Sequence, residues 1–227
     1  MYFTCEQGEC PGNLFKSLLS TGQFLFTVSK LPIFAPLTKI FSRGKISIQK
    51  LQGGCIMAKA LVVYYSRKGE NHMPGGIQVL EKGNTAYAAE FIQNALDADL
   101  FEIDTVKSYA ANYRECCMEA VEEFKTNARP EIRGFVEDIS GYDTIFVCFP
   151  CWCGTAPMCV FTFLEHYDLS GKKIVPLCTH EGSGLANAPE HLAKSCPGAV
   201  IGEGLAVRGH QAKDSEAEIA AWAKASV

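Results

Sequence analysis

Three short segments of the sequence combine glycine with small hydroxyl or aromatic side chains, a composition typical of loops that hold phosphate groups and planar rings. In the first, Ser66 ends an apolar run and Gly83-Asn84-Thr85 opens a helical pattern. A strand-to-helix junction gathers unpaired N–H groups and the positive end of a helix dipole, which favours a phosphate dianion. The hydroxyl groups of Ser66 and Thr85 add two donors. Asn84 and Thr85 are also expected to cap the helix, because their side chains accept hydrogen bonds from free amides.

The second segment, Pro150-Cys-Trp-Cys-Gly154, places a large aromatic side chain next to a glycine. Trp152 is suited to cover the face of a planar ring, and Gly154 lets main-chain N–H groups approach the edge of that ring. The alternative is that Trp152 only covers the end of a sheet. Cys151 and Cys153 also raise the question of a metal, but a C-x-C pair without a second pair at ligand spacing is poor evidence for one.

The third segment, Thr179-His-Glu-Gly-Ser-Gly184, is a glycine-rich turn. Its His180 is able to donate a hydrogen bond or a proton to a ligand. The alternative is that His180 forms a surface pair with its neighbour Glu181.

Sixteen residues, Arg67 to Lys82, separate the two halves of the phosphate motif. They are too polar and too rich in glycine to continue the strand, and too long for an ordinary strand-to-helix loop. We therefore expect an excursion attached to the phosphate site. Its basic residues Arg67 and Lys68 are expected to be solvated rather than bound to phosphate.

The elements that position these segments alternate along the chain from residue 58 onward. Five apolar runs predict strands, at 58–66, 100–104, 143–150, 173–178 and 200–207, and five periodic segments predict helices, at 84–97, 112–128, 156–166, 188–195 and 215–225. The second strand alternates apolar and acidic residues and should lie near an edge, whereas the third is uninterrupted and should be central. Such alternation implies right-handed crossovers and a parallel sheet covered on both faces. The predicted fold class is therefore α/β, a three-layer sandwich around a five-stranded parallel sheet.

The helix predicted at 112–128 is expected to bury one face against the core. That face carries Cys116, Ala120, Val121 and Phe124. In sheets of this kind, ligands bind beyond the carboxyl ends of the strands, where the strand order reverses. This rule brings the three segments together at one edge, as the loops 66–85, 150–155 and 179–184.

Charge divides the chain into two parts. Residues 1–56 carry six Lys and Arg against two Asp and Glu, and residues 57–227 carry fifteen against twenty-three, so the formal charges are about +4 and −8. We expect 1–56 to be a poorly structured N-terminal extension, with a basic targeting segment as the alternative, and 57–227 to be the folded domain.

The composition also excludes several classes of protein. No run approaches the 18 apolar residues of a membrane span, and no basic stripe with aromatics suggests nucleic acid, so we expect a protein that binds neither membrane nor nucleic acid. Cysteines inside apolar runs suit a reducing cytoplasm. No Ser/His/Asp order, paired carboxylates or Walker-type loop indicates a hydrolase or a nucleotide kinase.

Taken together, the motifs resemble those of the flavodoxin-like family, particularly its bacterial branch with a Tyr-Pro-x-Trp-Trp-Gly-type flavin loop. They are Val-Val-Tyr-Tyr-Ser66 with Gly83-Asn84-Thr85, then Phe149-Pro-Cys-Trp-Cys-Gly154-Thr-Ala-Pro157, and Cys178-Thr-His-Glu-Gly-Ser-Gly184. The resemblance covers about residues 58–227. It implies a sheet of strand order 2-1-3-4-5 and non-covalently bound FMN.

Carried over by motif, the resemblance implies three sets of FMN contacts. The phosphate would be held by Ser66, Asn84, Thr85 and Ala86. The isoalloxazine would be flanked by Pro150, Cys151, Trp152, Cys153 and Gly154. Its pyrimidine side would be closed over by Thr179, His180, Glu181, Gly182, Ser183 and Gly184.

The sequence departs from the family pattern in two places. The usual compact phosphate loop is split by Arg67–Lys82, and Cys153 replaces the second aromatic of the flavin loop. We expect the second change to leave one face of the ring less covered.

The function expected from the resemblance is that of an FMN-binding redox protein, which carries electrons between partners or to a small acceptor. An acidic surface would orient a basic partner protein. One alternative is an NAD(P)H-dependent quinone or nitro-compound reductase, which needs room for nicotinamide beside the flavin. Another is a flavodoxin-shaped interaction module without FMN.

Overall fold

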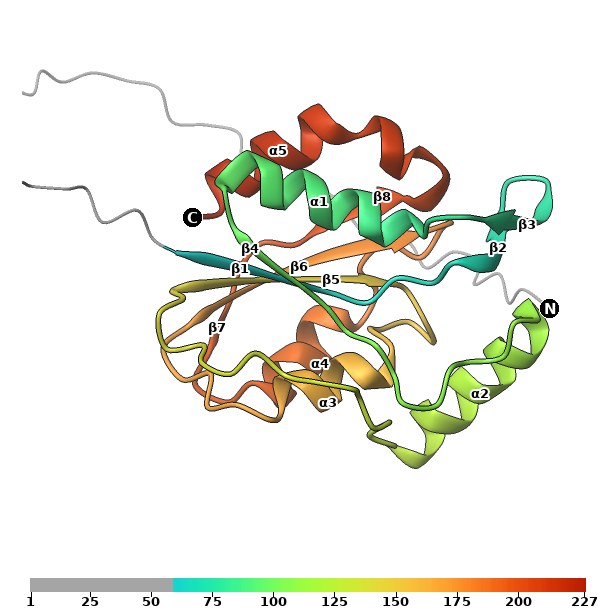
Figure 1. The fold of residues 1–227 in the computed structure, drawn as a ribbon, viewed down its shortest axis with the longest axis horizontal. Coiled ribbons are helices and arrows are strands. Elements are labelled where there is room, and N and C mark those ends of the chain that lie inside the picture. Colours follow the sequence, from blue (N-terminus) through green and yellow to red (C-terminus); the bar gives the residue numbers. More distant parts are fainter. Residues whose placement is uncertain (1–58) are drawn as a thin grey trace, which may run out of the picture. The chain divides into compact units, whose positions relative to one another are not determined.

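The computed structural model describes residues 59–227, and the expectation about residues 1–56 lies outside this range. Within the described part, one parallel sheet organises the fold (Figure 1). Its strands, in spatial order, are β4 (Asp99–Glu102), β1 (Ala60–Tyr64), β5 (Thr144–Pro150), β6 (Lys173–His180), and then β7 (Val200–Ile201) with β8 (Leu205–Arg208), both paired to β6. The predicted order 2-1-3-4-5 and the edge position of the second strand are confirmed.

The fifth strand, expected to be continuous over 200–207, consists of two pieces instead. Ile174 of β6 pairs with Ile201, but Leu177 pairs with Leu205, so the outer strand contains one extra residue. Pro176, which has no N–H to donate, lies opposite the break. A Cβ on Gly204 would lie 2.9 Å from the Pro176 ring, so glycine allows the backbone to pass there.

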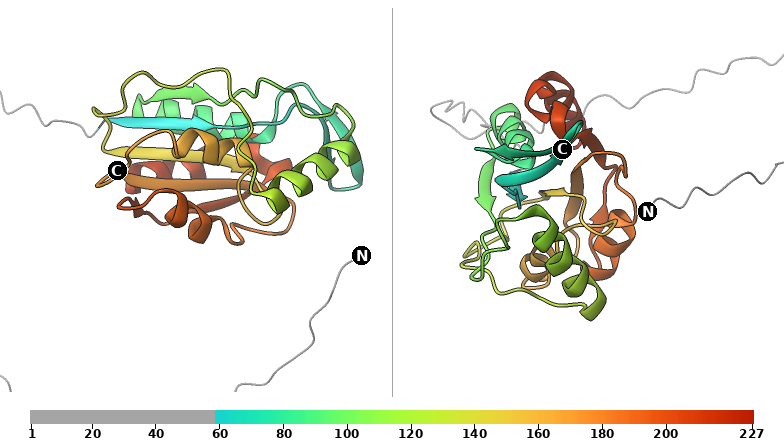
Figure 2. Two further views of the ribbon diagram at one scale, coloured as in Figure 1. Left: turned by 90° about the horizontal axis from the view of Figure 1, so that it is seen from below. Right: turned by 90° about the vertical axis from the view of Figure 1, so that its right-hand side faces the viewer.

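Helices cover both faces of the sheet (Figures 1 and 2). One face carries α1 (Asn84–Leu96) and α5 (Glu216–Ala225), the latter reached from β8 through the short helix η1 (Gly209–Asp214). The other face carries α3 (Met158–Leu164) and α4 (Ala188–Ser195). None of these helices, nor α2 below, is long and apolar enough to span a membrane.

The central strand β5 supplies side chains to both cores, as its uninterrupted apolar run predicts. Phe146 and Cys148 pack toward α1 and α5, whereas Val147 and Phe149 pack toward α3 and α4. All four side chains are fully buried. The strict alternation follows from the two-residue period of a strand.

Helix α2 (Tyr113–Thr126) departs from the expected packing. Its N-cap is Asn112, whose side chain accepts from the amides of Arg114 and Glu115. Figure 1 shows α2 extending beyond the carboxyl ends of the strands rather than lying flat on a face. Of the four predicted core positions, Cys116 and Ala120 are buried. The other two, Val121 and Phe124, are about 40% exposed.

The excursion between β1 and α1 is an ordered hairpin, which the sequence analysis did not predict. Strand β2 (Gly69–Met73) pairs with β3 (Gly76–Leu80) across the two-residue turn Pro74-Gly75. Gly75 has φ +90°, as the second central position of a type II turn requires. The Glu70 carboxylate accepts from the Tyr113 amide at 2.6 Å, which ties the hairpin to the start of α2.

Candidate functional site

The junction between β1 and α1 is built as a phosphate cradle, although its capping differs from the prediction. Helix α1 has Gly83 as its N-cap, which has no side chain to accept from the first turn, and neither Asn84 nor Thr85 caps it. The Thr85 hydroxyl instead hydrogen-bonds the Thr179 hydroxyl at 2.7 Å. The side-chain amide of Asn84 donates to the Met73 sulfur at 3.6 Å. The first turn of α1 therefore presents backbone N–H groups that have no intrahelical acceptor.

The other half of the junction holds the helix start in place. Ser66 Oγ accepts a hydrogen bond from the Ala86 amide at 3.1 Å. A Cβ on Gly83 would lie 2.2 Å from that oxygen and 2.5 Å from the carbonyl oxygen of Arg67. Only glycine allows the end of β1 and the start of α1 to approach so closely.

The second predicted segment forms a tight turn after β5. Cys153 and Gly154 both have positive φ, at 51° and 74°. Trp152 and Thr155 exchange two backbone hydrogen bonds of 2.9 Å across them. These features define a type I′ turn, in which a glycine at the second central position is favoured.

Trp152 covers the end of the sheet, one of its two predicted roles. Its ring makes edge contacts with Tyr65 and Tyr109, at centroid distances of 5.4 and 4.9 Å. Cys153, which takes the place of the family's second aromatic, is exposed beside it. Contact between Trp152 and a flavin stays a prediction.

The second and third segments are joined through Cys151. Its amide donates to the Thr179 carbonyl at 2.9 Å. The Cys178 thiol, and then the Ser183 hydroxyl and the Gly154 backbone, lie close to the Cys151 sulfur and lower its pKa to about 6 against the opposing effect of burial. The neighbouring Cys151, followed by burial, raises the pKa of Cys178, whose thiol donates to the carbonyl oxygens of Gly184 and Thr179 at 3.4 and 3.7 Å. The Cys151 sulfur therefore lies where the two segments meet.

The third segment does not form the alternative surface pair between His180 and Glu181. His180 Nδ1 accepts from the Gly182 amide at 2.9 Å, and burial, followed by the charge of Arg208, lowers the His180 pKa. Glu181 binds His210 instead, with Oε2 2.7 Å from the ring Nδ1 and Oε1 accepting from the His210 amide at 2.9 Å.

Sequence reasoning missed the contribution of Arg208, Gly209 and His210. Arg208 ends β8 and the other two follow it, so they reach the same carboxyl edge as the predicted loops. A Cβ on Gly209 would lie 2.8 Å from both the Asn84 amide nitrogen and a Glu181 carboxylate oxygen. The available signal was their position after the last strand, since the carboxyl-edge rule applies to that strand as well.

A cavity of about 900 Å³ opens beside the cradle. Its walls come from the end of β1, the hairpin, the start of α1 and the residues that follow β4. Ser66, Gly83 and Ala86 lie on its wall, whereas the loops at 150–154 and 179–184 do not line it. Of the predicted phosphate residues, Ser66 and Ala86 therefore line the cavity, whereas Asn84 and Thr85 do not. The Thr85–Thr179 hydrogen bond joins the cradle to the third segment, which Cys151 joins to the second.

Arg67 also lines this cavity, and the expectation that it is solvated is wrong. The side chain is only 9% exposed. Its guanidinium donates to the carbonyl oxygens of Glu70, Ala110 and Ala111 at 2.8 to 2.9 Å. Lys68, in contrast, is exposed as expected. Arg67 therefore clamps the loop before α2 to the base of the hairpin.

Comparisons with known proteins agree with this geometry. Residues 79–225 match the family model described as flavodoxin. Candidate flavoproteins from Bacteroides uniformis and Bacteroides eggerthii are each 29% identical with a TM-score of 0.60, covering 74% of this chain and 98% or 97% of theirs. A Lactobacillus acidophilus flavoprotein solved in complex with FMN is 22% identical with a TM-score of 0.53, covering 71% and 97%. No curated protein sequence matches the chain.

Proposed function

The chain belongs to the flavodoxin family, and from that premise we propose that it binds FMN non-covalently and carries electrons between redox partners or to a small acceptor. The family match over residues 79–225 is the observation that carries the proposal. Two features at the same edge of the sheet support it: the free backbone amides at the start of α1, and the turn at 150–155.

The residues present fit such a group. The Gly83 cradle, which a Cβ would fill, leaves the amides of Asn84 and Thr85 for a phosphate, with Ser66 beside them. The Ala86 amide already donates to Ser66 Oγ, so its role is to orient that hydroxyl. Residues 150–154 would flank the ring and 179–184 would close its pyrimidine side.

When bound, FMN supplies the transfer of one or two electrons, and the protein controls how the ring is held. The Trp152 turn and the 179–184 loop would exclude water from it. Cys151, whose pKa is lowered, would add a negative charge between these loops when it is ionised. Such a charge disfavours electron uptake nearby, so it would lower the potential of the group.

One observation favours a second function, that of an NAD(P)H-dependent quinone or nitro-compound reductase. The 900 Å³ cavity borders Ser66 and Ala86 and offers space for a second molecule beside the cradle. A redox partner protein, a small acceptor and NAD(P)H are therefore the proposed partners. We also propose a cytoplasmic location, on the basis of the many cysteines in apolar runs.

One absorption experiment distinguishes these functions. The full chain is purified, incubated with FMN, desalted, and then mixed with NADPH without oxygen. Retained yellow colour that NADPH does not bleach supports the carrier, and rapid bleaching supports the reductase. A colourless protein that takes up no FMN would contradict both and leave an interaction module.

A further inference from the structure

A second cavity, of about 420 Å³, lies among the end of α2, α3 and α4. Thr155 is on its wall, on the chain just after the Trp152 turn, but none of the predicted FMN contacts lines it. Phe124 of α2 lies on its wall together with Met158 and Phe161 of α3, and its ring remains 40% exposed.

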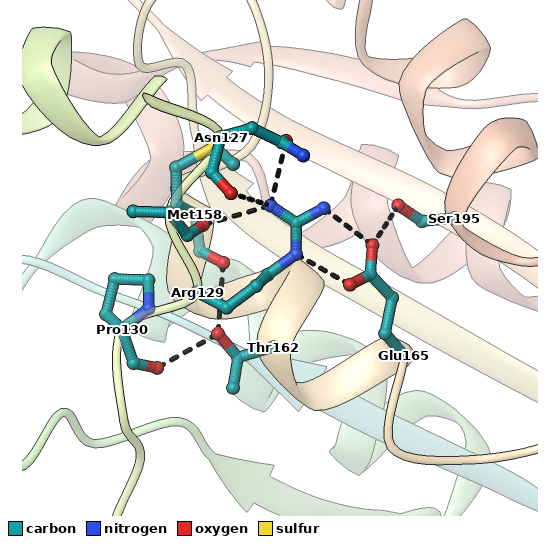
Figure 3. A network of polar contacts seen from close by, with 8 residues as sticks. Asn127, Arg129, Pro130, Met158, Thr162, Glu165 and Ser195 are labelled. Atoms are coloured by element: carbon teal, nitrogen blue, oxygen red, sulfur yellow. Dashed lines mark hydrogen bonds and ion pairs between the residues drawn. The ribbon is translucent and has the colours of Figure 1, made fainter. Parts of the chain in front are cut away.

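One wall of this cavity is a fixed polar network around Arg129 (Figure 3). Its guanidinium donates to both carboxylate oxygens of Glu165, at 2.6 and 2.7 Å, and also to Asn127. The Ser195 hydroxyl donates to the same carboxylate at 2.8 Å. Arg129 lowers the pKa of Glu165, so this acceptor is ionised and already occupied by three donors.

The opposite surfaces are aromatic and apolar. Phe124 of α2 and His191 of α4 have ring centroids 6.1 Å apart and are tilted by 35°. Met158 and Phe161 are buried beneath the cavity, and the Arg129 guanidinium lies 5.6 Å over the Phe161 ring. A planar ring would find a flat surface against Phe124 and a sulfur beside it.

The wall also contains a polar group with an unmet hydrogen bond. Thr155 is 1% exposed, and its hydroxyl has no hydrogen-bond partner in the described part of the chain. The backbone of Thr155 is already paired with Trp152. A buried hydroxyl without a partner is destabilising and rare, and it indicates a group that the protein atoms do not provide.

The remaining polar groups on the wall are mainly donors. Lys194 uses one N–H for Glu190, leaving two, and His191 offers its ring nitrogens. Glu165 already accepts three hydrogen bonds, so most of its acceptor capacity is used and the free polar groups on the wall are mainly donors. From this surplus, the aromatic walls and the unpartnered Thr155 hydroxyl, we propose that the cavity binds a small planar aromatic carboxylate.

Calorimetric titration of the full chain with 2-naphthoate tests the proposal. We expect saturable binding that persists after FMN is bound, because this cavity is separate from the FMN contacts. The neutral 2-naphthamide should bind at least about tenfold more weakly, because it cannot pair with the Lys194 ammonium as an anion. No saturable binding, loss of binding with FMN present, or equal affinity for the amide would each overturn the proposal.

Two variants locate the site. Phe124→Ala should weaken 2-naphthoate binding by about tenfold or more, whereas Met118→Ala, exposed on the same helix but off the cavity wall, should leave it unchanged. Thr155→Val removes the unpartnered hydroxyl with little change of shape. It should raise the Tm of the free protein while weakening binding, and a variant with a lower Tm or with unchanged affinity would contradict the role assigned to Thr155.

Discussion

At the scale of single residues, Cys151 is the cysteine of the described chain whose pKa the fold lowers. An ordinary thiol is neutral at pH 7, but the neighbouring Cys178, Ser183 and Gly154 favour the thiolate form of this one. Cys153, two positions away, is more exposed and has a pKa raised by partial burial and by neighbouring Cys117 and Cys151. We therefore expect Cys151 to be the more reactive thiol, although Cys153 is the more exposed one.

We expect alkylation of Cys151 by iodoacetamide to be half-maximal near pH 6 in the native protein, and near the ordinary value of 9.0 after unfolding in urea. Because the folded pKa is the lower one, the thiolate contributes stability that is fully present above pH 9 and is lost as the pH falls through 6. Mass spectrometry of Cys151 and Cys153 peptides measures both rates. Faster labelling of Cys153 at pH 7 would contradict this prediction.

Gly83 is the second residue with a specific local role, because the backbone packs against its Cα. Gly83→Ala should destabilise the protein by about 1–3 kcal/mol, because the new Cβ would overlap a backbone oxygen that cannot move freely. It should also weaken FMN binding, since the cradle must open. Urea unfolding and FMN titration measure the two effects. Gly134→Ala is the control, as nothing lies within 4 Å of its Cβ position, and equal effects in both variants would refute the close approach.

At the scale of elements, the hairpin and α2 support each other beyond the carboxyl edge of the sheet. Glu70 holds the first turn of α2, and Arg67 holds the loop that precedes it. These three hydrogen bonds join residues that are 43 or 44 positions apart along the chain. The hairpin is therefore a support for the site rather than an appendage.

Replacing Arg67 by Lys tests this support. A lysine keeps the charge but lacks the planar fork that reaches three carbonyl groups, so we expect a loss of about 1.5–3 kcal/mol in the free energy of unfolding. Lys68→Gln, at the exposed neighbour, should change it by less than about 0.5 kcal/mol. Chemical denaturation compares them, and a stability loss no greater in Arg67→Lys would show that the clamp is dispensable.

At the scale of the whole molecule, the acidic charge of residues 57–227 bears on the proposed encounter with a redox partner. A formal charge of −8 would steer a basic protein toward this part of the chain. Salt shortens the range of that field from about 30 Å at 0.01 M to about 8 Å at 0.15 M. Electron exchange with a basic partner should therefore depend on ionic strength.

We expect the rate of electron exchange between the FMN-loaded protein and a basic redox protein to fall steadily over this range of salt. Stopped-flow absorbance follows the oxidation of the flavin. A neutral quinone acceptor provides the control, because the rate at which it encounters the protein should not depend on salt. A rate with the basic protein that rises with salt would show that the acidic surface plays no part in the encounter.

Much of the fold was predictable from local pattern. The uninterrupted apolar run at 143–150 identified the central strand, and the mixed pattern at 100–104 identified the edge strand. The hairpin was not predictable in this way, because β2 is mostly polar and the alternating apolar residues of β3, Ile77 and Val79, are exposed rather than buried. The solvation expected for Arg67 was wrong for a related reason, since its acceptors are backbone carbonyls that any sequence carries.

By itself, the sequence determined the strands, their order through the family likeness, and the three loops at one edge, because burial imposes a periodic pattern and parallel strands end together. Only the tertiary structure decided how far α2 extends from the sheet, that the pKa of Cys151 is lowered, and that the Thr155 hydroxyl lacks a partner in the described part of the chain. These depend on distances between groups remote in the chain, where a shift of about 1 Å makes or breaks a hydrogen bond.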